Sequence, residues 1–197
     1  MKFLPTRKAP LSYSTLALLV VATYWLWSHF ANRHHWKEEV QLQNGELLTV
    51  ARSIQFEFDR PIGGVGGSDV IESTLEISSP DRKDSPPQWR HPPFLPLVFD
   101  RDPDNNEWFI VATFYMCTDW YSLGRPKLPY TEFRYRNGTW IQLPLSEKFI
   151  GREGNILVPN GRDVGPDYSL QMKRDKLSDP RVSPEYKGIV RTWKTYC

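Results

Sequence analysis

The sequence is poor in the residues that build most catalytic and metal sites. It has 2 cysteines and 4 histidines, and His91 is the one histidine beyond residue 35. One histidine and two widely separated cysteines do not make the ligand set of a usual zinc site. A Ser-His-Asp triad would depend on His91, and no Gly-x-Ser-x-Gly sequence presents a nucleophile. We therefore predict no catalytic residue, no metal site and no cofactor.

Basic residues are scarce beyond the N-terminus. Five of the 25 lysines and arginines lie in the first 37 positions, which contain no acidic residue. The rest of the chain is left with 20 basic and 23 acidic residues, a net charge of −3. Proteins that bind nucleic-acid phosphates usually present a broad basic surface. The sequence therefore predicts no nucleic-acid partner.

Charged residues are absent altogether from residues 9–28. An α-helix rises about 1.5 Å per residue, so twenty residues cover roughly 30 Å, the thickness of the hydrocarbon core of a bilayer. Aromatic side chains, among them Tyr13, Trp25 and Trp27, lie near both ends, as they do at membrane interfaces. We predict a transmembrane signal-anchor helix over residues 9–30, held in the lipid bilayer and preceded by a cytoplasmic tail of residues 1–8.

Two other interpretations of this segment stay open. A cleaved signal peptide needs small residues at its cleavage site, whereas this segment ends in bulky aromatic residues. A buried core helix leaves the basic residues on both flanks unexplained. The N-terminal flank is the more basic of the two, so the positive-inside rule places the N-terminus in the cytoplasm and the following domain outside it.

The rest of the chain is interrupted often by proline and glycine, which number 17 and 12 in the whole sequence. Frequent breaks favour short strands joined by turns. Residues 31–40 are predicted to form a juxtamembrane stalk and residues 41–197 an extracytoplasmic β-rich domain. Asn44-Gly45 and Asn137-Gly138 each predict a two-residue type I′ turn, because both positions of that turn need a positive φ. We expect a mainly β fold, either an antiparallel β-sandwich or an open meander.

The predicted strands follow from alternation of apolar and polar residues and from short apolar runs. The most apolar run of the domain, residues 108–117, is predicted to be the central buried strand. The Pro-rich residues 79–96 are predicted to be a surface loop or an edge, because proline cannot donate to a central ladder. The tail at residues 168–175 is predicted to be a strand or a short helix. Other predicted strands are residues 40–42, 46–50, 53–59, 70–77, 95–99, 130–136, 139–143, 155–158 and 189–196.

The two cysteines are Cys117, on the predicted central strand, and Cys197 at the C-terminus. If the domain is exported, an oxidising compartment can pair them in a disulfide that ties the C-terminus to the core. The alternative is two unpaired thiols.

An acidic segment offers three possible calcium ligands. Asp100, Asp102 and Asp104 match positions 1, 3 and 5 of a calcium-binding loop. Such a loop needs glycine at position 6 and glutamate at position 12, where this chain has Asn105 and Val111. We therefore predict a solvated turn at this place.

Several short segments together resemble a known family. They are Trp36-Lys-Glu-Glu-Val-Gln-Leu, Leu95-Pro-Leu-Val-Phe, the run that ends at Cys117, and Tyr135-Arg-Asn-Gly-Thr-Trp. In these segments the chain resembles an uncharacterised family of small membrane-anchored proteobacterial proteins, over most of residues 36–160. The resemblance implies a single-pass protein of the bacterial inner membrane with its C-terminal domain in the periplasm, and it implies no particular activity.

Aromatic and arginine residues in the predicted loops are candidate interface anchors, because these residue types dominate binding hot spots. Ordinary core and rim packing is the alternative for each of them. We expect a non-catalytic, membrane-tethered periplasmic interaction protein with a protein partner, either an envelope accessory or a toxin-neutralising partner. The alternative is a membrane-anchored hydrolase using carboxylates, which would show titratable groups converging in a pocket. The candidate residues are Trp89, Arg90, Trp120, Tyr121 and Arg125.

Overall fold

The computed structural model describes residues 18, 21, 32–59, 67–78, 85–159, 165, 167–194 and 197. The predicted tail at residues 1–8 lies outside these residues, and so does the predicted membrane helix at residues 9–30 apart from Leu18 and Val21. Among the described residues, no helix combines the length and the apolar character needed to cross a membrane.

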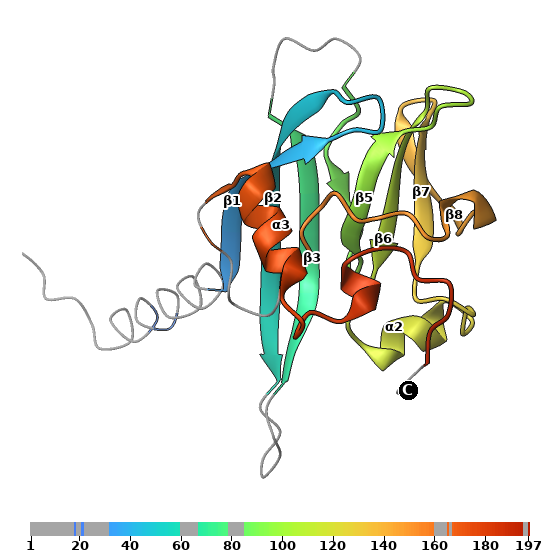
Figure 1. Cartoon of the computed structure of the whole chain (residues 1–197). Coiled ribbons are helices and arrows are strands. Elements are labelled where there is room, and N and C mark those ends of the chain that lie inside the picture. Colours follow the sequence, from blue (N-terminus) through green and yellow to red (C-terminus); the bar gives the residue numbers. More distant parts are fainter. Residues whose placement is uncertain are drawn as a thin grey trace, which may run out of the picture. The chain divides into compact units, whose positions relative to one another are not determined.

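Two β-sheets make up the domain that follows (Figure 1), so the prediction of a mainly β fold is confirmed. One pairing is parallel: β9 lies beside β1, with Lys37 opposite Asp167. The first sheet has the order β4-β3-β2-β1-β9, formed by Trp89–Arg90, Gly67–Ile77, Leu47–Asp59, Arg33–Gln41 and Asp167–Tyr168. The second is an antiparallel meander of β5 to β8, formed by Leu95–Arg101, Trp108–Thr113, Thr131–Arg136 and Thr139–Pro144.

The described helices are short. Helix α2 (Cys117–Ser122) follows the end of β6, and α3 (Leu170–Ser178) follows β9. The Ser169 side chain caps α3 by accepting a hydrogen bond of 3.3 Å from the Met172 N–H. Two 3₁₀ turns, η1 (Glu147–Phe149) and η2 (Pro184–Tyr186), complete the set.

The core is built by both sheets together. In one cluster of buried side chains, Ile54 of β2 joins Phe109 of β6; in another, Val50 of β2 joins Phe99 of β5 and Phe133 of β7. Every second residue of β2 from Leu48 onward to position 56 is buried, as expected for one face of a strand. Removal of these side chains from water is the main favourable term in the folding of the domain.

The two Asn-Gly turns differ. Asn137 and Gly138 both have a positive φ, at 49° and 85°, between β7 and β8, which confirms the predicted type I′ turn. Between β1 and β2, Gly45 has a φ of 87° and Asn44 does not adopt a positive φ. Leu42 N–H bonds to Glu46 carbonyl oxygen at 2.8 Å, so the loop has three residues and the two-residue prediction was wrong there.

Residues 33–41, most of them in the predicted stalk, form strand β1 of the first sheet. Trp36, Glu38 and Val40 are buried and the residues between them are more exposed. The alternation is that of a half-buried strand. The sequence analysis missed this strand because a charged residue, Glu38, occupies one of its three inward positions.

Three other predicted strands differ from the structure: one is shorter than predicted, and two segments form no strand. The strand predicted at residues 108–117 stops at Thr113, so Cys117 begins α2 and does not lie on the central strand. Residues 155–158 do not form a strand, although 156–158 are buried, because the N–H groups of Asn155 and Ile156 both donate to the Leu97 carbonyl at 3.1 Å. Residues 189–194 are irregular, and Ile189 bonds to Arg152 in the loop after η1.

Candidate functional site

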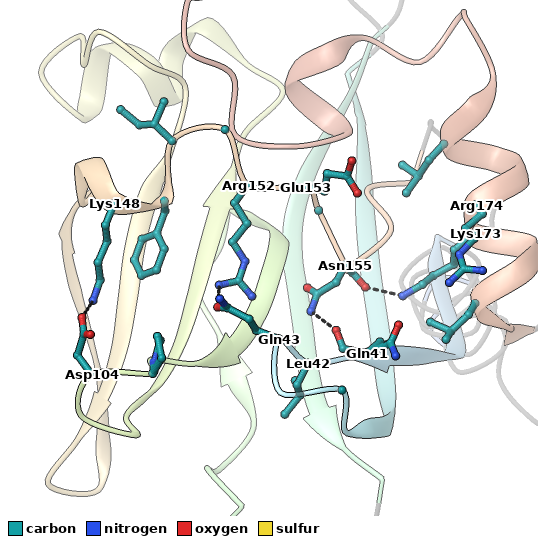
Figure 2. A pocket seen from close by; sticks show the side chains of 18 residues that line it. Gln41, Leu42, Gln43, Asp104, Lys148, Arg152, Glu153, Asn155, Lys173 and Arg174 are labelled. Atoms are coloured by element: carbon teal, nitrogen blue, oxygen red, sulfur yellow. Dashed lines mark hydrogen bonds and ion pairs between the residues drawn. The ribbon is translucent and has the colours of Figure 1, made fainter.

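A groove with a volume of about 1020 Å³ forms where the β1–β2 turn, the segment after η1 and the first turns of α3 meet (Figure 2). Amide, charged and glycine residues predominate in its lining, with a few apolar side chains among them. The residues that matter below are Gln43, Asp104, Lys148, Arg152, Glu153, Asn155, Lys173 and Arg174.

Asn155 holds the two sheets together at the floor of this groove. Its Nδ2 donates to the carbonyl of Gln41 in β1 at 3.0 Å and to that of Phe99 in β5 at 2.9 Å. Its Oδ1 accepts from Phe99 N–H at 2.9 Å. Because both the oxygen and the nitrogen of the Asn155 side-chain amide are hydrogen-bonded, the orientation of this amide is fixed. The floor of the groove is therefore preorganised (Figure 2).

At one end of the groove, Lys148 lies between two carboxylates. Its Nζ is 2.7 Å from Asp102 Oδ2 and 2.7 Å from Asp104 Oδ2, and Arg134 binds the same Asp102 oxygen at 2.6 Å. Burial alone would raise the pKa of Asp102. Hydrogen bonds from Lys148, the Asp104 N–H and Arg134 outweigh that effect and lower the pKa to about 2. Asp102 is therefore an anion at neutral pH and cannot serve as an acid.

In the middle of the groove, Arg152 is held by buried Asp100. The Arg152 guanidinium also donates to Gln43 Oε1 at 3.2 Å, and the Asp100 carboxylate accepts from the Gln43 N–H at 2.8 Å. Asp100 and Asp102 are each 1 % exposed, so the prediction of a solvated turn was wrong for these two aspartates. Within the described residues, no group of three or more His, Cys, Asp or Glu is placed to hold a metal ion.

At the other end of the groove, Glu38 is shared by two basic side chains. Its Oε1 is 2.6 Å from Arg52 Nη1, and its Oε2 is 3.2 Å from Lys173 Nζ and accepts the Leu157 N–H at 3.0 Å. The side chains of Glu38 and Arg52 are both 0 % exposed. The guanidinium of Arg52 also lies 5.0 Å from the ring centre of Trp36, a cation–π distance.

These contacts decide what the groove can do chemically. Three buried carboxylates, Glu38, Asp100 and Asp102, lie behind the lining of the groove, and each accepts hydrogen bonds from a cation and from a backbone N–H. For Asp102, whose pKa is lowered to about 2 by these hydrogen bonds, this rules out a role as a general acid at neutral pH. The carboxylates that line the groove itself are Asp104, which is paired with Lys148, and Glu153.

Three of the five predicted interface residues come together at α2. The Arg125 guanidinium lies 5.0 Å from the ring centre of Tyr121 and 5.9 Å from that of Trp120. Tyr121 is 45 % exposed and Trp120 is partly exposed. Arg125 adopts a φ of 60°, which is uncommon for a residue other than glycine, and its N–H bonds to the Trp120 carbonyl at 3.0 Å. We call these three residues the α2 patch.

Trp89 and Arg90 lie elsewhere, on the edge strand β4. Trp89 is fully buried, and its ring meets that of Phe133 at 5.4 Å in the core, so the structure places it inside and not on a binding surface. Arg90 is exposed and forms an ion pair with Glu72 at 2.5 Å. The prediction that the Pro-rich segment runs along an edge is confirmed at these two residues.

The two cysteines lie at disulfide distance, with Cα atoms 5.5 Å apart, and they are separated by 80 positions in sequence. The C-terminal segment is further fixed to α2 by two contacts: Tyr121 donates its hydroxyl to the Cys197 carbonyl at 3.1 Å, and Trp193 meets Trp120 edge to face at 6.0 Å. A second groove, of about 500 Å³, opens beside the α2 patch and is lined mainly by apolar residues that include Leu123, Pro126, Leu143 and Leu145.

Comparison with known proteins gives no match, whether with protein-family models, with curated proteins or with solved structures. The fold and the sites therefore define the class of this protein. It is a β-rich domain of two sheets with buried ion pairs in its interior and a patch of aromatic and arginine side chains on its surface.

Proposed function

We propose that this chain is a non-catalytic interaction protein of the bacterial periplasm, anchored in the inner membrane through residues 9–30, whose sandwich-like β domain binds a protein partner at the α2 patch. The observation that carries the proposal is the cluster of Trp120, Tyr121 and Arg125, fixed to the C-terminus at the cysteine pair. Exposed aromatic rings stacked with arginine lose little side-chain entropy on binding, which is why such residues act as interface anchors.

The surroundings of the α2 patch support this proposal. A groove of about 500 Å³ adjoins it and offers an apolar cavity to a partner side chain. The cysteine pair is the type of cross-link that persists in an oxidising compartment. The hydrolase alternative finds less support, because Asp102, which lies beside the first groove, is held as an anion by Lys148 and Arg134.

The test is site-specific photo-crosslinking in living cells. A photoreactive amino acid is placed at Tyr121, which is 45 % exposed, or at Met172 on α3, which is 47 % exposed and serves as the matched control. We expect one cross-linked species of defined mass from position 121 and none from position 172, because only the first lies in the patch.

Arg125→Glu is the companion variant in this experiment. Reversal of the charge that stacks on Tyr121 is expected to reduce the cross-link at least tenfold while the domain stays folded, because Arg125 is exposed. Equal cross-linking from positions 121 and 172, or turnover of a hydrolase substrate by the purified protein, would reject the proposal.

A further inference from the structure

Lys173 is unusual among the charged residues that line the groove because it is buried. The residue is 4 % exposed, although it lines the groove of about 1020 Å³. Its Nζ reaches two acceptors: the Asn155 carbonyl oxygen at 2.5 Å, which Figure 2 shows, and Glu38 Oε2 at 3.2 Å. Lysine is rarely buried to this extent, and when it is, its charge must be compensated.

The charges around Lys173 do not balance if it is protonated. Glu38 supplies one negative charge, and the guanidinium of Arg52, which no physiological pH deprotonates, already neutralises it. A protonated Lys173 would leave a buried cluster with a net charge of +1, a strongly unfavourable arrangement. Of the other charged groups, partly buried Glu39, which accepts the Leu170 N–H at 3.0 Å, favours the charged form of Lys173, and exposed Arg174 is its neighbour on the same helix.

The hydrogen bonds fit a neutral amine equally well. A neutral amine has two N–H donors, and Nζ has two acceptors, so its lone pair is directed away from both of them. Burial lowers the pKa of Lys173 most; Glu38 raises it, Arg52 lowers it and Glu39 raises it, and the net shift is downward.

We propose that Lys173 is a neutral amine nucleophile at the edge of the groove and a modification site for small activated acyl compounds. In the reaction, the amine nitrogen attacks the carbonyl carbon and forms an N–C bond. The bond to the leaving carboxylate breaks with its electron pair, and the amine proton passes to solvent. The product is an uncharged amide, which leaves the Glu38–Arg52 pair balanced. The reagent must be small because Lys173 is nearly covered.

Competitive labelling of the full-length protein with trace acetic anhydride tests the proposal, with each lysine quantified by mass spectrometry from pH 7 to pH 9. Exposed Lys127 is the reference. A mostly protonated amine gains about tenfold in its neutral fraction per pH unit, and its labelling rate rises in proportion. We expect the rate at Lys173 to stay nearly constant over this range and to exceed that of Lys127 at least tenfold at pH 7.

The variant Arg52→Met checks the physical cause. It removes the competing cation, so Glu38 would then pair with a protonated Lys173, and the labelling rate at Lys173 should rise about tenfold per pH unit. A flat profile in the folded variant would contradict the charge argument. If the variant does not fold, the wild-type profile decides: a tenfold rise per pH unit at Lys173, or no labelling there, overturns the proposal.

Discussion

Replacement of Cys117 and Cys197 together by serine is expected to lower the free energy of unfolding by about 4 kcal/mol. The cysteines are 80 residues apart in sequence, so their bond removes a large part of the conformational freedom of the unfolded chain. The measurement is urea unfolding of the purified domain, followed by tryptophan fluorescence. The wild-type protein treated with reductant should unfold at the same urea concentration as the variant.

Thr118→Ser is the matched control for this experiment, because Thr118 is the exposed neighbour of Cys117 on α2. It should change the free energy of unfolding by less than about 0.5 kcal/mol. A loss below about 1 kcal/mol in the double cysteine variant would show that the C-terminal segment is held by its other contacts alone. The contacts of Tyr121 and Trp193 would then be sufficient.

Glu38→Gln is expected to destabilise the domain by about 3–5 kcal/mol, the range found when one partner of a buried ion pair is removed. The substitution keeps the shape of the side chain but leaves the Arg52 guanidinium, which is 0 % exposed, without a counter-charge. The measurement is the shift of the urea midpoint at constant slope.

Glu39→Gln supplies the control, since Glu39 is adjacent in sequence but only partly buried. We expect a loss below about 1 kcal/mol for it. The double variant Glu38→Leu with Arg52→Met should recover much of the loss, because apolar side chains of similar size can replace a buried ion pair. Equal effects of the substitutions at positions 38 and 39 would contradict the account of this cluster.

Local signals in the sequence were sufficient for much of the fold. The β7–β8 hairpin follows from alternation on both sides of Asn137-Gly138, where both turn positions require a positive φ. The segments at residues 155–158 and 189–194 were mispredicted as strands from their short apolar runs. Ile156 and Ile189 are buried there, but each N–H donates to a single carbonyl, that of Leu97 and that of Arg152, without forming a continuous ladder.

The ionic part of the groove was missed, although its signal is present in the sequence. Arg52 stands between Val50 and Ile54 in the period-two pattern of β2, and Glu38 stands between Trp36 and Val40 in β1. A charged residue at an inward position of a strand must find a partner in the core. Which partner it finds, such as Lys173 from a distant helix, depends on tertiary contacts that no local pattern encodes.

The α2 patch was predicted in part. Trp120, Tyr121 and Arg125 lie within six consecutive residues, so their clustering follows from the end of a single helix and the loop after it. Trp89 was assigned to the surface because it lies in a Pro-rich segment. Its burial depends on a two-residue pairing of β4 with β3, too short to leave a pattern.

The most direct test of the proposed setting is the thiol state of the full-length protein in the cell. Free thiols are alkylated before lysis, membrane and soluble fractions are separated, and the intact mass of the protein is measured in each. The account predicts that the protein lies in the membrane fraction and carries no alkyl adduct. It should gain two adducts only when its cysteines are reduced before alkylation. A protein in the soluble fraction with both Cys117 and Cys197 alkylated would contradict it.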